Sequence, residues 1–353
     1  METKVVKVLP VKQHSLEIEA AGQIIRKGGL VAFPTETVYG LGGDALNADS
    51  SRKIYAAKGR PSDNPLIVHI CRMEDLAPIV EEIPDMAYAL AKAFWPGPLT
   101  MIFKKSDLVP YATTGGLDTV AVRMPDHEVA LSFIRASGGY IAAPSANTSG
   151  RPSPTTAAHV YEDLQGRIEQ ILDGGDVGIG LESTIVDLTE KVPMILRPGY
   201  ITQEMLSEVI GEVTIDQAIL DASSTKAPKA PGMKYRHYAP KGELTVVEGP
   251  KDAVIRRINE LALADRQAGH KVGIIATEET KDAYEADVVM SVGTRANEET
   301  IAHNLYGILR EFDELDTTRM YSESFENPGI GRAIMNRLLK AAGQKVIHCT
   351  DEE

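Results

Sequence analysis

The chain of 353 residues is long enough for about two domains of ordinary size. Its 43% hydrophobic and 25% charged residues are typical of a globular protein with a packed core, and no apolar run reaches the roughly 20 residues of a membrane span. The formal net charge of −13 argues against tight, salt-sensitive binding of nucleic acid over a large face. The two cysteines provide no disulfide framework, and residues 1–15 lack the apolar stretch of a secretory signal, so we expect a cytoplasmic protein.

Helical and extended patterns alternate through residues 1–211. The segment 15–29 predicts a helix, because Ile18, Ala21 and Ile25 share one face and two glycines can end it. Further helices are expected at 49–57, 85–95, 128–138 and 202–211. Strands are expected at 30–33, 64–70, 99–104, 119–125, 140–147, 183–188 and 193–199. The mixed order and the short hairpin-like pairs predict a twisted, partly antiparallel α/β sheet.

The alternation breaks between Gly211 and Lys241, where prolines stand among Ser, Ala and Lys, which is typical of a linker. Beyond it, strands expected at 243–249, 271–277, 286–293, 319–324 and 345–349 accompany helices at 253–269, 298–315 and 331–343. This order predicts a small Rossmann-like α/β domain, although no G-x-G-x-x-G follows its first strand, so a bound dinucleotide is not expected. We therefore predict a domain at 1–212, a basic, Pro-containing linker at 213–242 and a second domain at 243–353.

Several common catalytic motifs are absent from the sequence. No G-x-x-x-x-G-K-[ST] loop is present, so a P-loop would not hold a nucleotide, and no H-E-x-x-H or Cys/His cluster indicates zinc. Ser145 follows a proline in PSANTSG, but there is no G-x-S-x-G and no paired histidine is evident. A hydrolase nucleophile is therefore not indicated.

Polar and basic residues stand at the ends of the predicted strands. Lys58, Arg60, Asn64 and His69 surround a proline-containing turn. A lysine and an arginine two positions apart could both reach a polyphosphate, the lysine as a point charge and the arginine as a fork. A solvated loop beside a histidine of the core explains the same residues equally well.

Arg123 stands in the apolar strand TVAVRMP, and a buried guanidinium needs an anionic partner. That partner is either a structural carboxylate, the more common case, or the carboxylate of a substrate. Hydroxyl and amide side chains gather in the turn APSANTSGRPSPT, which is either an anion-binding nest or an ordinary Ser/Asn-rich loop. Ser183 at a strand start and Arg197 before a proline are each open to a structural or a ligand-binding interpretation.

The order and spacing of these segments are more specific than any one of them. FPTETVYGLG, KGRPSDNPLIVHI, WPGPLT, VAVRMPDH, PSANTSGRPSPT, STIVDL and LRPG follow one another along the chain. In this succession the chain resembles the threonylcarbamoyl-AMP synthase family, whose core is a YrdC-like domain. The resemblance covers roughly residues 10–210, and APGMKYRHYAP with the domain after it resembles the longer, two-domain branch. The resemblance implies a YrdC-like twisted mixed sheet, followed by the linker and the Rossmann-like domain.

The resemblance also implies an activity. Members of this family join L-threonine, bicarbonate or CO2, and ATP into L-threonylcarbamoyl-AMP and pyrophosphate. The product is consumed by downstream tRNA threonylcarbamoyl transferase proteins, which modify the adenosine beside the anticodon. We accordingly expect Mg²⁺ to be carried by the ATP phosphates, with no metal held by protein side chains alone, and we expect tRNA binding to be weak or indirect.

The resemblance implies a role for particular residues of this chain. The L-threonine pocket would be formed by Thr35, His69, Arg123 (which grips the carboxylate), Ala143 and Ser183. The ATP site would be formed by Lys58, Arg60, Asn64, Thr119, Ser145, Asn147, Ser153, Arg197 and Tyr235, with Lys58 and Arg60 also catalytic. Tyr235 would lie in a lid formed by residues 234–238, for which an incidental basic tether is the alternative. Glu36 is expected to cap or pair locally.

Two other functions remain open at this point. A YrdC-like fold could bind RNA on its concave face without any turnover, although the acidic balance weighs against it. A carbamoyl-adenylate-forming domain of the kind that matures hydrogenases would share the fold, but its extra acylphosphatase-like and zinc-binding segments are not seen here.

Overall fold

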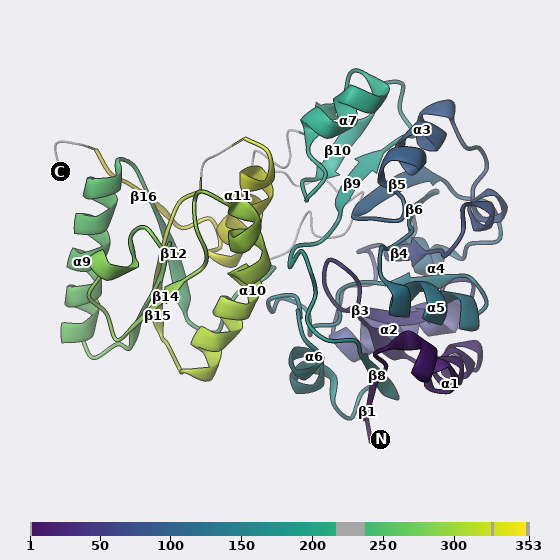
Figure 1. The fold of residues 1–353 in the computed structure, drawn as a ribbon, viewed down its shortest axis with the longest axis horizontal. Helices are drawn as coiled ribbons and strands as arrows, with labels where there is room; N and C mark the ends of the chain where they lie inside the picture. The colour runs from purple at the N-terminus through teal and green to yellow at the C-terminus, as the bar shows by residue number, and fades with distance from the viewer. Residues whose placement is uncertain (1, 217–236, 326–327, 351–353) are drawn as a thin grey trace. The chain divides into compact units, whose positions relative to one another are not determined.

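A computed structural model describes residues 2–216, 237–325 and 328–350 (Figure 1). The chain forms two compact units, one of Met1–Ser149 with Ser153–Tyr235 and the other of Gly150–Pro152 with Arg236–Glu353. No helix in the described ranges is both long and apolar enough to cross a bilayer.

The first unit contains a large mixed sheet with the strand order β1-β8-β2-β3-β7-β4-β6-β5-β9-β10-β11. Its strands are β1 (Lys4–Lys7), β2 (Val31–Phe33), β3 (Gly40–Asp44), β4 (Ile67–His69), β5 (Leu99–Lys104), β6 (Thr119–Arg123), β7 (Ile141–Ala143), β8 (Gln170–Asp173), β9 (Thr184–Asp187), β10 (Met194–Arg197) and β11 (Thr214–Ile215). Strand β4 pairs in parallel with β6 and antiparallel with β7. The predicted mixed sheet is therefore confirmed.

Helices cover this sheet, and the predicted ones are present with shorter bounds in places. They are α1 (Ser15–Arg26), α2 (Ala48–Lys58), α3 (Asp85–Phe94), α4 (Tyr111–Thr114), α5 (Glu128–Ala136), α6 (Ala157–Leu164) and α7 (Gln203–Ile210), with 3-10 turns at Val11–Gln13, Met73–Asp75 and Ala77–Ile79. Sequence patterns did not indicate β1, β3, β8, β11, α4 or α6. These elements are short: β3 is the glycine-rich GLGGD, and β1 is the edge strand KVVK, whose lysines hide its strand pattern.

The sheet is buried on both faces, which explains why its strands are short apolar runs without alternation. Along β2, Val31 and Phe33 pack into one apolar cluster with helices α1 and α5. Leu30 and Ala32 pack into the other cluster, with residues of α2 and α3. The segment LVAF therefore contributes side chains to two hydrophobic clusters, one on each face of the sheet. The loop that begins at Pro34 thus follows a well-packed strand.

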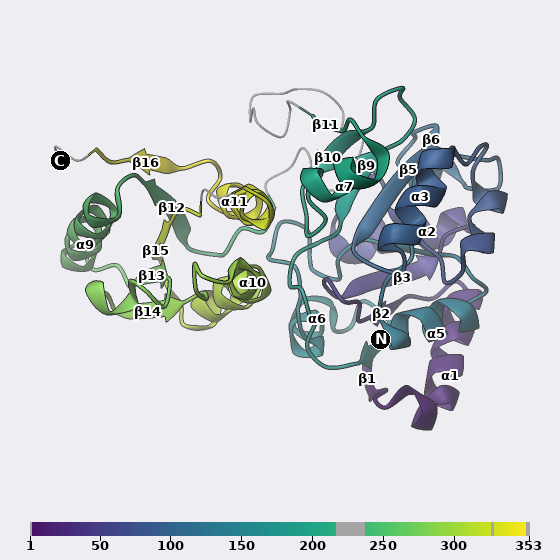
Figure 2. The ribbon, with the colours of Figure 1, turned by 45° about the horizontal axis from the view of Figure 1, so that its top comes forward.

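Helices α1 and α5 pack closely on one face of the sheet (Figure 2). The contact is made possible by Gly22 of α1, because a Cβ atom there would lie 2.6 Å from the carbonyl carbon of Ala136. Ile18, Ala21 and Ile25 are buried beside it, as the helical pattern predicted. The glycine costs helix propensity, and the close approach of the two backbones compensates for it.

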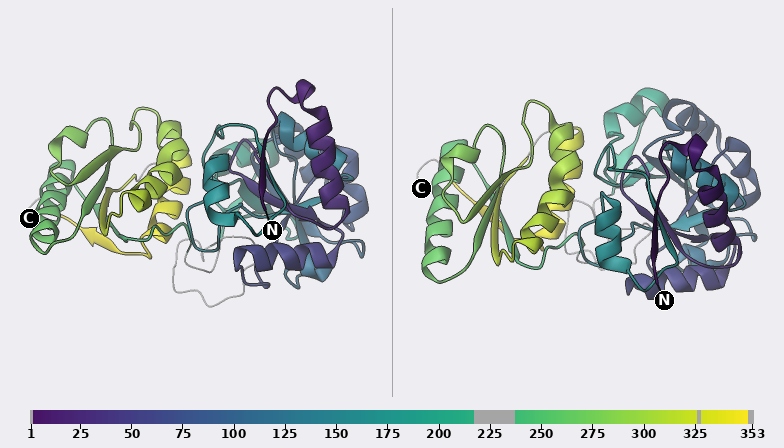
Figure 3. Two further views of the ribbon diagram at one scale, coloured as in Figure 1. Left: turned by 90° about the horizontal axis from the view of Figure 1, so that it is seen from below. Right: turned by 60° about the horizontal axis from the view of Figure 1, so that its bottom comes forward.

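The second unit is a parallel five-stranded sheet with the order β14-β13-β15-β12-β16. Its strands are β12 (Glu243–Glu248), β13 (Val272–Ala276), β14 (Val288–Ser291), β15 (Arg319–Glu323) and β16 (Val346–His348), and its helices are α9 (Lys251–Gln267), α10 (Glu298–Glu314) and α11 (Ile330–Ala341), with a 3-10 turn at Lys281–Ala283. Helix α9 covers one face, and α10 and α11 cover the other (Figure 3). The predicted Rossmann-like domain is confirmed.

Two segments outside these elements also belong to the second unit. One is Gly150–Pro152, where the Pro152 carbonyl oxygen accepts a 2.6 Å hydrogen bond from the Arg310 guanidinium of α10. The other begins at His237, and the buried Tyr238 ring lies 5.1 Å from the ring of Tyr306. A predicted linker residue, Tyr238, is thus part of a packed aromatic contact.

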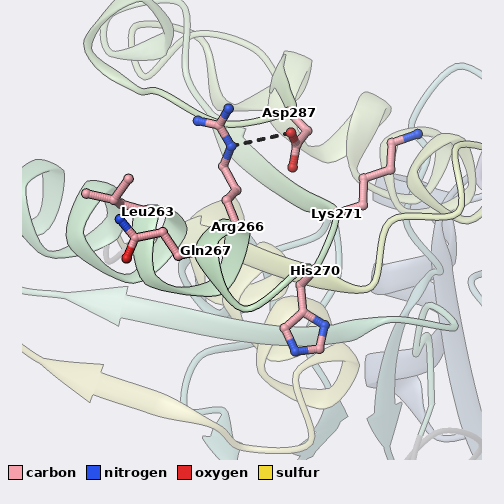
Figure 4. A pocket seen from close by; sticks show the side chains of 7 residues that line it. Leu263, Arg266, Gln267, His270, Lys271 and Asp287 are labelled. Carbon is pink, nitrogen blue, oxygen red and sulfur yellow. Dashed lines mark ion pairs between the residues drawn. The ribbon is translucent and has the colours of Figure 1, made fainter.

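A hollow in the second unit lies where α9 ends and β13 begins (Figure 4). It is lined by Leu263, Arg266, Gln267, Gly269, His270, Lys271 and Asp287. Arg266 turns toward Asp287, with 3.4 Å between the guanidinium Nε and a carboxylate oxygen, whereas Lys271 extends away from this pair. Because the pair is about one-third to two-fifths exposed, it contributes little to stability.

Two glycine substitutions should separate close packing from helix propensity. Gly22→Ala should destabilise the protein by about 1–3 kcal/mol, because the added methyl group has no room beside Ala136. Gly307→Ala in α10 meets nothing within 4 Å and should stabilise by about 0.5–1 kcal/mol through propensity alone. Urea denaturation followed by circular dichroism measures both. A Gly22→Ala variant as stable as the parent would contradict the packing argument.

Candidate active site

The register of the central strands brings polar residues of different segments together. In the β4–β6 pair, His69 lies beside Arg123. In the β5–β6 pair, Arg123 lies opposite Thr100. Strand β9 starts at Thr184 beside Leu99, so Ser183 enters the same region. Sheet pairing therefore makes neighbours of residues that are far apart in the sequence. Thr100 and Ser183, for example, are 83 positions apart, yet their hydroxyl oxygens lie 2.8 Å from each other.

Arg123 is the centre of this group, and it is buried. One of its terminal nitrogens, Nη1, donates to the Thr37 hydroxyl at 2.9 Å, and Nε donates to the Gly97 carbonyl oxygen at 3.3 Å. Its other terminal nitrogen lies 2.6 Å from a carboxylate oxygen of Glu36. The anionic partner that this arginine requires is thus Glu36, which the sequence had assigned only to local capping or pairing.

The loop after β2 holds its threonines by hydrogen bonds within the loop. The Thr35 hydroxyl donates to the Val38 carbonyl oxygen at 2.7 Å and lies 2.9 Å from the Thr37 hydroxyl. The backbone of Ile179 donates to the Glu36 carbonyl oxygen at 2.8 Å. Thr35, Thr37 and Arg123 therefore form one buried network. Sequence reasoning identified Thr35 and missed Thr37, although the repeated hydroxyl in PTET is the signal that could have found it.

His69 lies in this network as a neutral imidazole. Burial lowers its pKa to about 3, and the nearby charge of Arg123 acts in the same direction. Its Nδ1 lies 3.1 Å from the Ile67 carbonyl oxygen, and the ring also has a backbone hydrogen-bond contact with Ile141, so the single N–H of the neutral imidazole can serve one of these two groups. Its ring meets the Phe33 ring edge to face, with 6.0 Å between the centroids.

Ser183 is held by Arg197, which is also buried. The guanidinium donates from Nε to the Ser183 carbonyl oxygen and from Nη2 to its hydroxyl, both at 3.1 Å. The strand ends can approach this closely because a Cβ atom at Gly199 would lie 2.4 Å from the Thr184 nitrogen. Arg197 therefore fixes the start of β9. Sequence reasoning missed Thr100, since one threonine in an apolar strand carries no distinguishing signal.

The polar turn after β7 is held by Lys58 at the end of α2. The Lys58 ammonium donates to the Ser145 carbonyl oxygen at 2.5 Å and to that of Asn147. The Ser145 hydroxyl donates to the Asn147 side chain at 2.6 Å, and the Ser149 nitrogen donates to the Lys58 carbonyl oxygen. Helix α2 ends at Gly59, whose left-handed φ of 62° turns the chain away. Lys58 is thus a buried cation that holds the turn after β7 through two of its backbone carbonyl oxygens.

Ser153 lies beside the first group. Its hydroxyl donates to a Glu182 carboxylate oxygen at 2.5 Å, and Glu182 directly precedes Ser183. Sequence reasoning did not select this carboxylate.

The other predicted residues have separate positions. The Arg60 guanidinium donates to the carbonyl oxygens of Asn64 and Pro65 at 3.2 and 3.1 Å, so it closes its own turn. Thr119 starts β6 opposite Lys104, whereas Arg123 ends that strand. Ala143 ends β7 opposite Ile67 and leads into Ser145. Tyr235 lies outside the described residues.

The donor set of this site is cationic and hydroxylic. Among the described residues, no three His, Cys, Asp or Glu side chains come together in a way that could hold a metal ion. Buried guanidinium, ammonium, hydroxyl and backbone groups are suited to orienting and neutralising anions.

Comparisons with known proteins match nearly the whole chain. A family model described as telomere recombination matches residues 23–199, and one described as the threonylcarbamoyl-AMP synthase C-terminal domain matches residues 201–343. The threonylcarbamoyl-AMP synthase of Pyrococcus abyssi is 53% identical over 331 residues, which cover 94% of this chain and 95% of that protein. The chain belongs to the threonylcarbamoyl-AMP synthase family. The resemblance inferred from its motifs is therefore confirmed.

Relatives from other organisms and a solved structure agree with this membership. The threonylcarbamoyl-AMP synthase of Bacillus subtilis is 51% identical over 332 residues, covering 94% of each chain. A crystal structure of Pyrococcus abyssi Sua5 complexed with L-threonine covers 99% of both chains, with 50% identity and a TM-score of 0.92. Both units of this chain thus have the fold of the two-domain members.

The neutral state of His69 should make stability depend on pH. The unfolded chain protonates this residue near pH 6.5, but the folded chain does so only at about pH 3. Stability should therefore be complete above pH 6.5 and fall as the pH decreases toward 3. At pH 5 the contribution lost is on the order of 2 kcal/mol.

His69→Gln removes this titration, so its unfolding free energy should fall less than that of the parent between pH 7 and pH 5. Urea unfolding followed by the fluorescence of Trp95, which lies in the first unit, measures the difference. Equal pH dependence in parent and variant would show that His69 is not the titrating group.

Proposed function

We propose that this chain is an L-threonylcarbamoyl-AMP synthase, which makes L-threonylcarbamoyladenylate and pyrophosphate from L-threonine, bicarbonate or CO2, and ATP. The observation that carries the proposal is the 53% identity over 94% of the chain to a relative of that name. The buried Thr35–Thr37–Arg123 network supports it, since it offers hydroxyl and guanidinium groups suited to a small hydroxylated amino acid.

The reaction suits a site without a catalytic triad. The threonine ammonium first loses a proton to solvent, and the free amine adds CO2 and loses a second proton to become a carbamate. A carbamate oxygen then bonds to the α-phosphorus of ATP. The bond from that phosphorus to the bridging oxygen breaks, and pyrophosphate leaves. Because the attacking carbamate is already an anion, no strong general base is required. The protein's task is to align the reactants, neutralise charge and exclude water.

The first group of residues would form the amino-acid pocket. Arg123 would bind the threonine carboxylate, because a buried guanidinium forms strong charge-assisted hydrogen bonds to such a group. Neutral His69, which lies beside Arg123 in the strand register, would help to orient the threonine. Thr35, Ser183 and the backbone at Ala143 would complete the pocket. The L-threonine complex of the Pyrococcus abyssi protein supports this class of ligand.

The second group would face the nucleotide. Lys58, with Ser145 and Asn147, would meet the phosphates, and Arg60 and Asn64 would extend this cationic side. Thr119, Ser153 and Arg197 would line the remainder of the site. Tyr235 stays a predicted nucleotide contact in a lid over the site.

Mg²⁺ would accompany ATP. The described residues bring together no three carboxylate, histidine or cysteine side chains for it, whereas the hydroxyl and amide of Ser145 and Asn147 are hard ligands beside which phosphate oxygens and water would hold the ion. When bound, the ion would neutralise phosphate charge.

The chain would act in the cytoplasm as the supplier of an activated carbamoyl group. Its product would be consumed by tRNA threonylcarbamoyl transferase proteins, and contact with tRNA would be weak or indirect. The formal charge of −13 and the names of the relatives do not favour an RNA-binding module without turnover.

Substrate dependence tests the activity directly. Purified protein with ATP, Mg²⁺ and bicarbonate should release pyrophosphate only when L-threonine is added, since the carbamate of threonine is the attacking group. Enzyme-coupled pyrophosphate detection measures this, with L-serine and carbamoyl phosphate as comparison substrates. Strong release with either of these and none with L-threonine would defeat the assignment.

Replacing the central arginine should separate the two halves of the site. Arg123→Ala should weaken L-threonine binding at least about tenfold, because a buried charge-assisted contact is lost, and should change ATP binding much less. Isothermal titration with each ligand measures this, and Arg52→Ala, an exposed arginine of α2, is the matched control. An equal loss for ATP would mean that the pocket is divided differently.

A further inference from the structure

The ion pair between Glu36 and Arg123 is deeply placed. The two side chains are 13% and 5% exposed, and their charged atoms lie 2.6 Å apart. Glu36 is fixed by its own backbone, whose carbonyl oxygen accepts from Ile179. Its carboxylate is therefore a permanent feature of the amino-acid pocket and not a surface group that happens to reach inward.

The Glu36 carboxylate has acceptor capacity to spare. Among the described residues, neither of its oxygens receives a hydrogen bond in good geometry, and the ion pair to Arg123 is the contact that balances its charge. His127 also senses the charge of Glu36, but burial, the larger effect, lowers the pKa of its imidazole and so disfavours the cationic form. A carboxylate can accept about four hydrogen bonds. A further cationic donor is what Glu36 lacks.

Arg123 also has donors to spare for an arriving carboxylate. A guanidinium has five N–H groups. Its hydrogen bonds to Gly97 and Thr37 use the N–H of Nε and one N–H of Nη1, whereas Nη2 faces Glu36 as an ion pair without a hydrogen bond in good geometry. A ligand carboxylate can therefore bind beside Glu36 without breaking the existing pair.

Charge balance then decides which ligands are accepted. A carboxylate without a cation would place two buried anions around one guanidinium, and an unpaired buried charge is costly. An α-amino acid brings an ammonium only two bonds from its carboxylate carbon, so the filled pocket holds two cations and two anions. The pocket is thus complementary to a zwitterion.

We infer that Glu36 binds the α-ammonium group of the incoming amino acid, so that the Glu36–Arg123 pair selects zwitterionic α-amino acids over carboxylates without an ammonium. This inference rests on the proposed function, since it assigns Arg123 to the substrate carboxylate. Glu36 is then a specificity-determining residue, acting by leaving its own charge unbalanced when the wrong ligand binds.

The test compares two ligands that differ at one group. L-Threonine carries the ammonium, and 2,3-dihydroxybutanoate of the same stereochemistry replaces it with a hydroxyl. Isothermal titration of the full-length chain should show at least about a tenfold preference for L-threonine in the parent. In Glu36→Gln the preference should shrink to within about threefold, and Glu36→Asp, which keeps the charge, should restore part of it.

The ratio of the two affinities separates specificity from structural damage. A general distortion of the pocket would weaken both ligands together and leave the preference unchanged. Glu169→Gln, a first-unit glutamate that accepts a hydrogen bond from the Leu30 backbone, is the control and should keep the parental preference. If Glu36→Gln does not fold, a parent that binds both ligands equally still overturns the inference.

Two results overturn the inference. One is a parent that binds both ligands equally, and the other is a folded Glu36→Gln variant that keeps the full preference for L-threonine. Either result leaves threonine-dependent pyrophosphate release in the parent intact, so the proposed function survives. A parent that neither binds L-threonine nor releases pyrophosphate with it overturns both.

Discussion

A buried guanidinium must be matched by an anion, and this constraint organises the first unit. Arg123 ends an apolar strand at the middle of the sheet, where water cannot solvate its charge. Glu36 and Thr37 satisfy it from the loop after β2, and the same loop is fixed by backbone hydrogen bonds to residues 179 and 180. The need to pair one charge therefore fixes the loop after β2 and orients its hydroxyl groups.

In the proposed reaction the site would act by positioning and electrostatics, with no strongly activated nucleophile. His69 is held neutral by burial, and Lys58 is held against main-chain carbonyl oxygens. The positions and charges of such groups change little when a ligand reacts. Fixed charges and dipoles of this kind suit a reaction between an anionic carbamate and a triphosphate. Ser153 is held at the start of β9 by its hydrogen bond to Glu182, and the turn 145–149 is held separately by Lys58 and by the bond from Ser145 to Asn147.

Much of this protein could be predicted from the sequence alone. Apolar runs such as LVAF and the helical face of Ile18, Ala21 and Ile25 predict local structure, because burial and backbone period leave their pattern in adjacent residues. The succession of polar segments predicts the family, and with it Thr35, Arg123 and Lys58 as candidate site residues. The edge strand β1 could not be predicted, because its four residues KVVK are too few to distinguish a strand from a loop.

Only the tertiary structure decided the partners. Which carboxylate faces Arg123, that Thr100 meets Ser183 and that Glu182 meets Ser153 depend on strand register between segments far apart in the chain. The neutrality of His69 likewise follows from burial, which no local pattern encodes. The sequence by itself determined which residue types stand at the strand ends, because that is a property of adjacent positions. Their pairing was decided by the folded sheet, because charge and hydrogen-bond complementarity act through space.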